Sequence, residues 1–376
     1  MRQRIICFLI IISFFTMFSE RVYGADTEVE TLIGTKINQM NLEEIDYYLE
    51  GAGTDFSFSQ IIQEIMSGEF DFSPKEIFSK VLKTMFSEVY NQVDNIKKIM
   101  FIAILCGFLK TLEDSFESKD VAELGFFVSY ILLIYIVMTL FYEGCALVLN
   151  MTNTLIVLLK QMIPLFLTVM VFSGTGAEGA VMGPFIMGTA GVLSVVIQNG
   201  IVPAIGFTAV LELANNISGK GLLTQLSSLF KKFIEYAIKG CAFVFMAVTA
   251  LQKTGVSAVT GIAGKTARGA ISAVPIVGDI MNGAIDTAAG FTGLLKNSFT
   301  VATVILVCGV VMLPVIKLAV MYLVYKMTAA LIEPISEPRL IKALSSAGDF
   351  TAMLIGCLFV VSSMFVFSTI ILLGVT

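Results

Sequence analysis

The chain has 376 residues, of which 56% are hydrophobic and 14% charged, and its net charge is −5. Because a soluble domain carries roughly 25% charged residues, this composition excludes an ordinary soluble protein and indicates an all-α, polytopic membrane protein. His is absent, which excludes His-based metal sites and triads, and the acidic balance argues against nucleic acid as a partner.

Residues 1–24 have the pattern of a secretory signal peptide. Arg2 and Arg4 precede an apolar run at 5–18, and Gly24 closes a short stretch of small or neutral residues. We expect cleavage after Gly24, and an uncleaved anchor is the alternative because the residues before this point are imperfect for cleavage. Either reading sends the following chain across the membrane if the basic end stays inside.

Residues 25–98 are predicted to form a small, acidic, helical extracytoplasmic region. They hold six basic and 14 acidic side chains. Ser57 and Gln60 have the spacing of a capping box before one short helix, and Ser73 followed by Pro74 marks the start of a long amphipathic helix. We expect that helix to lie on the membrane surface or to pack on the shorter helices.

Residues 99–376 are predicted to be a multi-span membrane domain. Apolar runs at 99–112, 121–142 and 155–172 are its first candidate spans. The intervening segment 143–154 has no Lys or Arg, which favours a loop outside the cytoplasm.

Glycine becomes frequent in the middle of the chain. Asn199, Gly200 and Pro203 interrupt an apolar run, so 180–217 is predicted to be a helical hairpin or two half-helices. Basic residues then gather around the start of the next span, 233–251, and we place them on the cytoplasmic side. They are Lys220, Lys231, Lys232 and Lys239.

The stretch 255–298 is packed with Gly and Ala, although it lies among long apolar segments. Each Gly costs a water-exposed helix roughly 1 kcal/mol, whereas small residues let helices approach closely in a membrane. At about 100° per residue, the part after Pro275 separates into an apolar face and a small or polar face. The apolar face holds Val277, Met281, Ala284, Ala288, Phe291 and Leu295.

The small or polar face is the candidate functional surface. It could be a helix–helix contact, or it could line a conduit or lie on a lipid surface, and the pattern leaves both readings open. Asp279 and Asp286 are only about 20° apart on a helix, so one watery surface could serve both carboxylates. The face comprises Gly278, Asp279, Asn282, Gly283, Asp286, Gly290 and Gly293.

The last third of the chain contains two long apolar stretches. The first, 299–332, is too long for one simple crossing and is expected to break at Pro314. A rigid polar connector at 333–339 precedes the last span, 350–375. The six Cys of the chain form no CxxC pair, so we expect buried thiols without a disulfide framework.

Charges inside apolar runs often mark transport chemistry in membrane proteins. Here they are scattered without a paired motif, which favours structural or interfacial roles. The sequence has no phosphate-binding loop, zinc-protease or serine-hydrolase motif, so we expect neither an enzyme nor a cofactor. The charged candidates are Lys160, Glu212, Glu235, Lys317, Asp279 and Asp286.

Three segments carry a resemblance to a known family. They are GTAGVLSVVIQNGIVPAIGFTAVLELANNIS (188–218), LSSLFKKFIEYAIKGCAFVFMAVTALQ (226–252) and PIVGDIMNGAIDTAAGF (275–291). Together with the signal segment, the acidic region and the order of the spans, they make the chain similar to the stage III sporulation protein AE family of endospore-forming bacteria. The resemblance covers nearly the whole chain and is most specific over 174–340.

The resemblance implies a role in sporulation after engulfment, in the mother-cell membrane that surrounds the forespore. It implies membrane lipid, other stage III sporulation A-type proteins and a forespore-side protein as partners, and it supplies no catalytic residues. We expect a component of a channel or secretion-like complex, plausibly a homo-oligomeric conduit. A secondary transporter, which would show paired inverted repeats, and a non-conducting scaffold for partner proteins are the alternatives.

Overall fold

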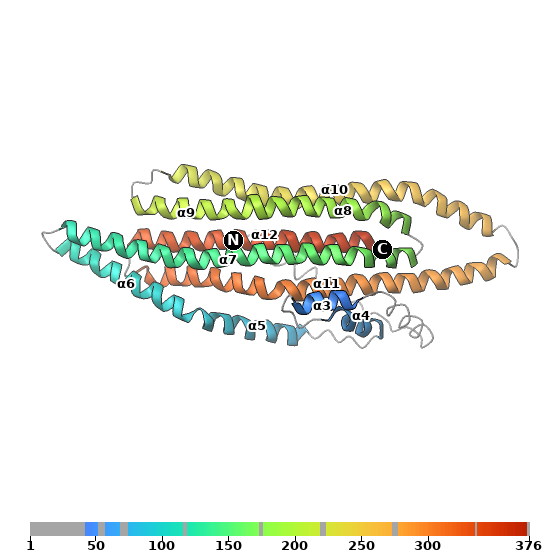
Figure 1. Cartoon of the computed structure of the whole chain (residues 1–376), viewed down its shortest axis with the longest axis horizontal. Helices are drawn as coiled ribbons and strands as arrows, with labels where there is room; N and C mark the ends of the chain where they lie inside the picture. Colours follow the sequence, from blue (N-terminus) through green and yellow to red (C-terminus); the bar gives the residue numbers. More distant parts are fainter. Residues whose placement is uncertain are drawn as a thin grey trace.

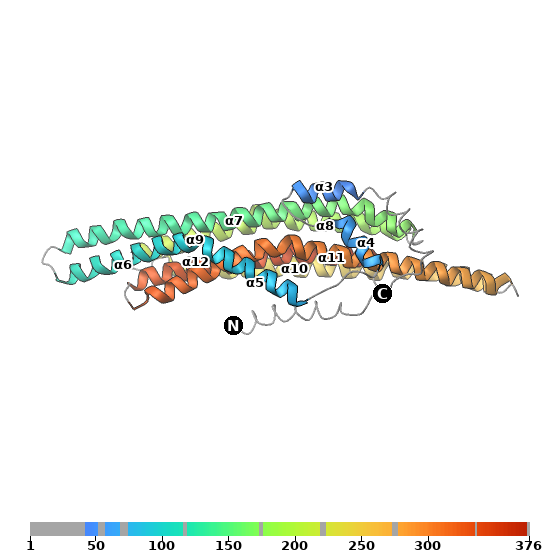
Figure 2. The same cartoon turned by 90° about the horizontal axis from the view of Figure 1, so that it is seen from below.

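The computed structural model describes residues 42–51, 57–67, 74–115, 119–172, 176–218, 223–272, 277–334 and 337–373, and side chains at 251–295 lie outside this description. The described helices lie side by side in an elongated bundle (Figure 1, Figure 2). In chain order they are α3 (Glu43–Gly51), α4 (Phe58–Ser67), α5 (Pro74–Asn91), α6 (Val93–Ser115), α7 (Lys119–Phe172), α8 (Gly176–Val196), the π-helix η1 (Ile197–Ile201), α9 (Val202–Ser218), α10 (Thr224–Ser272), α11 (Val277–Ile332) and α12 (Pro338–Leu373).

Several helices are long and apolar enough to cross a membrane, which confirms the prediction of an all-α, multi-pass membrane protein. From α7 onward, successive long helices run in opposite directions along the bundle (Figure 1). The candidate spans within the described residues are Phe127–Val171, Gly183–Asn216, Thr224–Ala250, Lys296–Ile332 and Pro338–Leu373.

The predicted outside loop at 143–154 is wrong, because these residues form the middle of α7. Gly144 does not make a turn there: a Cβ at this position would approach Met321 Cε to 3.2 Å, so the glycine lets α7 lie close to α11. Thr152 donates its hydroxyl to the Val148 carbonyl at 2.8 Å, within the helix. Tight packing and internally satisfied polar groups therefore keep the segment helical.

Of the two alternatives predicted for 180–217, the hairpin is wrong, because α8 continues through η1 into α9 without reversing direction (Figure 1). The alternative of two half-helices agrees with the structure, since α8 and α9 are separate α-helices joined at the predicted interruption. At this point the Val202 N–H donates to the Ile197 carbonyl, five residues back. The ring of Pro203 would clash with the carbonyl four residues before it in a regular α-helix. A single widened turn accommodates the proline, so the run bends locally instead of folding back.

The break expected at Pro314 is not found, since this proline lies inside the continuous helix α11. The tertiary contacts explain why the helix survives: α11 packs more extensively on α12 than any other pair of described helices does. Tyr325 of α11 also donates its hydroxyl to the Val137 carbonyl of α7 at 3.1 Å. Packing on both sides outweighs the hydrogen bond that the proline removes.

The N-terminal helices pack against the long bundle. Phe58 of α4 meets Phe299 of α11 edge to face, with ring centroids 6.3 Å apart. The apolar face of α5 packs on α11, so this amphipathic helix does not rest on the shorter helices. Glu88 of α5 also pairs with Lys317 of α11 at 3.5 Å. The region 25–98 stays a prediction as a separate extracytoplasmic unit, because its described helices share a core with the spans.

Candidate functional site

Four helix ends meet at one end of the bundle. There α9 connects to α10 and α11 connects to α12 (Figure 1). A cluster of charged and hydroxyl side chains lies a few turns inside this end, between helices that are otherwise apolar. We call it the four-helix polar cluster, and it comprises Glu212, Ser227, Lys231, Lys326, Ser345, Ser346 and Asp349.

Asp349 of α12 is the centre of this cluster. One carboxylate oxygen lies 2.9 Å from Lys326 Nζ of α11, and the other lies 3.3 Å from Lys231 Nζ of α10. Lys326 also donates to the carbonyl and the hydroxyl of Ser345, at 2.9 and 2.8 Å. One carboxylate therefore ties together two lysines from different helices, and all three side chains are about two-thirds buried or more.

Glu212 of α9 is the second acid of the cluster. Its carboxylate accepts hydrogen bonds from Ser227 of α10 at 2.9 Å and from Ser346 of α12 at 2.5 Å. One turn further along α9, Asn215 accepts the backbone N–H of Leu223 and donates to Thr224. These bonds fix the α9–α10 junction and satisfy the start of α10.

Close packing sets the position of both lysines. A Cβ at Gly348 would lie 3.1 Å from Lys326 Cε, so the absent side chain makes room for the lysine stem. The Lys231 ammonium lies 5.2 Å from the ring centroid of Phe350, which itself meets Phe141 of α7 edge to face. A cation over an aromatic face is stabilised, so Lys231 is held by both a charge and a ring.

The cluster contains two lysines and two carboxylates, so its charges balance. Groups of this kind stabilise a membrane bundle only as a set, because removing one partner leaves another charge unpaired in a poorly solvated place. The arrangement can hold four helices in register and can open if they separate. It contains no activated nucleophile, and within the described ranges no group of three metal-ligating side chains is close enough to hold an ion.

A second surface lies on the outer face of α10. Lys232, Glu235 and Lys239 are exposed there and fall within about 60° of one another around the helix. Large aromatic side chains share this face, and Lys239 Nζ lies 5.7 Å from the ring centroid of Tyr236. The exposed aromatic residues of this face are Tyr236 and Phe243.

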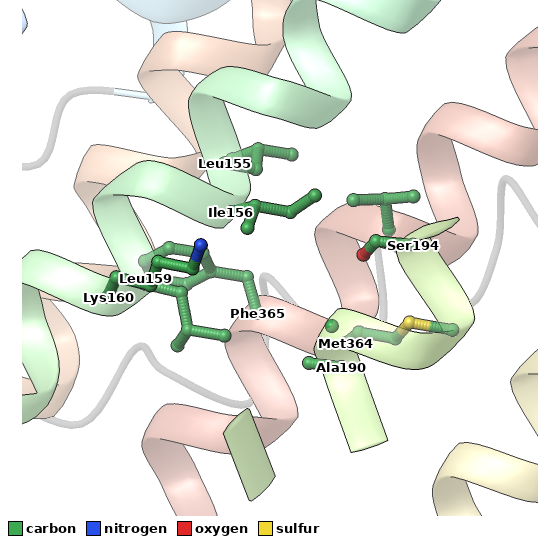
Figure 3. Close-up of a pocket in the computed structure, with 10 residues that line it drawn as sticks. Leu155, Ile156, Leu159, Lys160, Ala190, Ser194, Met364 and Phe365 are labelled. Carbon is green, nitrogen blue, oxygen red and sulfur yellow. The ribbon is translucent and has the colours of Figure 1, made fainter. Parts of the chain in front are cut away.

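The charged candidates predicted from the sequence lie in different parts of the structure. Glu212 joins the four-helix polar cluster, Lys317 pairs with Glu88, and Glu235 lies on the outer face of α10. Lys160 lines a small groove between α7, α8 and α12 (Figure 3). The structure does not bring these four residues together.

The predicted conduit-facing residues lie on the first turns of α11. The helix from Val277 is confirmed in its backbone. Whether their side chains meet water or another helix is untested, because they fall outside the described side chains. These residues are Gly278, Asp279, Asn282, Gly283, Asp286, Gly290 and Gly293.

Sequence reasoning missed the centre of the polar cluster. The sequence pattern places Lys231 on the cytoplasmic side and does not single out Lys326 or Asp349, although each lies in an apolar helix. The only signal of Lys326 and Asp349 in the sequence is that each is a lone charge of opposite sign on one side of the α11–α12 connection, and their spacing from that connection differs. Of the six Cys expected to be buried thiols, Cys7 lies outside the described residues. Cys106, Cys145, Cys241 and Cys357 are free and buried, and Cys308 is free and partly buried.

The comparisons with known proteins agree on one family. A family model described as Stage III sporulation protein AE (spore_III_AE) matches residues 56–376. A protein of Bacillus subtilis (strain 168) named Stage III sporulation protein AE is 25% identical over 316 residues, which cover 83% of this chain and 78% of that protein. No solved structure matches the chain.

Proposed function

Because the chain belongs to the stage III sporulation protein AE family, we propose that it is a multi-pass membrane component of a channel or secretion-like complex between the mother cell and the forespore. In this proposal it resides in the mother-cell membrane around the forespore and works with other stage III sporulation A-type proteins and a forespore-side partner. It forms an oligomeric conduit or the core subunit of one, and it is not an enzyme.

The outer face of α10 is the observation that carries the oligomeric part of this proposal. Lys232, Glu235 and Lys239 disfavour a lipid environment for this face, because charged side chains are costly in hydrocarbon. The exposed aromatic rings of the same face disfavour bulk water, since 71% of Tyr236 and 73% of Phe243 are exposed. Because the outer face of α10 suits neither lipid nor bulk water, we infer that it contacts other copies of the chain around a water-filled space.

The remaining features of α10 agree with this role. Of the candidate spans within the described residues, α10 has the least buried apolar window. The basic and acidic groups alternate along its outer face, so a neighbouring copy can meet Glu235 with a lysine. The small and polar face on the first turns of α11 remains our second candidate for a wall of the conduit.

Two other functions fit the family and have their own signatures. A secondary transporter needs paired repeats with helices interrupted at matching places. The widened turn at 197–201 has no matching break in α11, which continues through Pro314, so this reading is the weaker one. A scaffold would present the α10 face to a different protein and would conduct nothing.

Cross-linking between copies tests the oligomer. Single Cys are placed at Phe243, on the outer face of α10, and at Val210, an exposed position of α9, in a chain without native Cys. A short bis-maleimide should give covalent dimers at position 243 and monomers at 210. Monomers at 243 in the membrane of sporulating cells would refute the α10 interface.

Two further measurements separate the functions. Flux of small solutes through reconstituted oligomers is expected for a conduit, saturable ion-coupled flux for a transporter, and none for a scaffold. Deletion of the gene should leave vegetative growth intact and arrest development after engulfment. Normal heat-resistant spores from the deletion strain would contradict the sporulation role.

A further inference from the structure

A groove opens on the bundle surface between α7, α8 and α12 (Figure 3). Leu155, Ile156 and Leu159 of α7 line it together with Ala190 of α8 and with Met364 and Phe365 of α12. Its enclosed volume is small, about 30 Å³, so an occupant would lie along the open groove and not inside a cavity. The lining is almost wholly apolar, so the groove suits a hydrocarbon chain.

The α8 side of the groove has room for an occupant. Gly191 lines the groove, and a Cβ built on it would meet no atom within 4 Å. The protein therefore leaves open space here that no neighbouring side chain fills. Glycine on the lipid-facing side of a span makes such a depression without disturbing the helix.

Lys160 is the only charged residue of the lining, and its side chain is exposed. None of the ion pairs found within the described residues involves it. The two helices that pack beside Lys160 offer no counter-charge nearby. In α12, no charged residue follows Asp349. In α8, the only charged residue is Glu178, which is about 24 Å along the helix from Ser194 in the groove lining. Because Lys160 lies within the candidate span Phe127–Val171, an anion from outside the chain would stabilise its ammonium in the membrane.

The two features together define the ligand. A free anion would neutralise Lys160 and leave the apolar groove empty, whereas a neutral lipid would fill the groove and leave the ammonium unpaired. A molecule with a negative headgroup and a hydrocarbon chain satisfies both. Lys160 lies twelve residues before the end of α7, and its flexible stem lets the ammonium reach outward toward a headgroup.

We propose that this groove is a binding site for an anionic phospholipid, with the phosphate on Lys160 and an acyl chain between α7, α8 and α12. The lipid is then a structural ligand of the bundle, and it covers the seam where α8 meets α12. This site is independent of the proposed conduit, because it lies on another face from the outer surface of α10.

The absence of Trp from the chain allows a direct test. Phe365→Trp places a single fluorophore in the groove, in the full-length protein reconstituted into phosphatidylcholine vesicles. Brominated acyl chains quench Trp on contact, so brominated phosphatidylglycerol and brominated phosphatidylcholine are titrated separately. We expect half-maximal quenching at an about fivefold lower mole fraction of the anionic lipid. Equal mole fractions for the two lipids would overturn the site.

Matched variants assign the preference to Lys160. In the Phe365→Trp background, Lys160→Gln should abolish the preference and Lys160→Arg should retain it. Lys317→Gln removes a lysine that is already paired with Glu88, and it should leave the preference unchanged. A loss with Lys317→Gln equal to that with Lys160→Gln would show a general charge effect and contradict the proposal.

An added anion separates the two possible sources of phosphate. Millimolar inorganic phosphate should leave quenching by brominated phosphatidylglycerol unchanged, because the acyl chain contributes to binding. Full reversal of quenching by inorganic phosphate would indicate a site for free anions and would overturn the assignment to lipid.

Discussion

At the scale of single residues, Asp349 joins more helices through ion pairs than any other acid among the described side chains. It faces two ammonium groups from different helices, at 2.9 and 3.3 Å, and about two-thirds of its side chain is buried. A partner lost from such a set leaves the other charges poorly solvated. The stability of the α10–α11–α12 arrangement should therefore depend on this one carboxylate.

We expect Asp349→Asn to destabilise the protein by about 1–3 kcal/mol, less than for a fully buried pair because the side chains are about a third exposed. Thermal unfolding in detergent, followed by circular dichroism, measures the change. The matched control is Asp94→Asn, which breaks the highly exposed pair with Lys97 and should change stability by less than about 0.5 kcal/mol. Equal effects at the two positions would contradict the role of Asp349.

Gly348 supports the same contact through its missing side chain. Gly348→Ala should push the Lys326 stem away from Asp349, since the new Cβ would come within 3.1 Å of it. We expect a loss of stability with Lys326 present and little or none in the Lys326→Ala background, as a double-mutant cycle of thermal unfolding would show. Gly206→Ala is the control, because its Cβ would meet no atom within 4 Å and helix propensity then favours alanine.

At the scale of helices, apolar periodicity predicted where the long elements lie but not where they end. The segment 143–154 has the composition of a loop, yet Gly144 allows close contact with α11 and keeps it helical. The interruption around Pro203 is real, but one widened turn absorbs it. Both outcomes depend on neighbours distant in sequence, which a local pattern cannot contain.

The polar cluster was hidden for the same reason. Its members come from four helices, and each charged member, taken alone, resembles an ordinary charged residue at the membrane interface. Only Glu212 stood out, because it lies near the end of a long uncharged run. The partnership of Lys326 with Asp349 depends on how α11 turns back into α12, and no spacing in the sequence encodes that geometry.

The first turns of α11 carry a prediction that is still to be tested. If they line a conduit, single Cys at Asp279, Asn282 and Asp286 should react with a small membrane-impermeant thiol reagent in the assembled complex, because ionised groups there require water. Cys on the apolar side of the helix should be spared. Equal labelling of both sides, or none on the polar side, would leave the face as a dry helix contact. The apolar positions are 277, 281, 288 and 291.

At the scale of the whole molecule, charge is distributed unevenly along the bundle. After Asp349, α12 has 24 residues without a charge up to Leu373, and α11 has none between Lys296 and Lys317. A 24-residue helix is about 36 Å long, close to the roughly 30 Å of a hydrocarbon core. We place the bilayer around this layer, with the α9–α10 connection on the cytoplasmic side because lysines gather there.

This placement predicts that α3 and α4 face away from the cytoplasm, as expected for the region after the signal segment. They lie toward the end where α7 gives way to α8, opposite the α9–α10 connection (Figure 1). Because α5 packs along α11, the protease-accessible part should end before Pro74. Protease added to cells with permeabilised outer layers should remove that part, and protection there with digestion only from the cytoplasmic side would reverse the orientation.

The length of α7 has a consequence for how the protein sits in lipid. Its apolar stretch from Phe127 to Val171 has 45 residues and so is about 68 Å long. Fitting it into a hydrocarbon core of roughly 30 Å would need a tilt of about 60°, whereas spans tilt by 40° at most. Hydrophobic mismatch of this size exceeds what a bilayer can absorb, so the surplus apolar surface must be covered by protein. Helices α6, α8 and α12 of the same chain provide cover of this kind, since all three pack along α7.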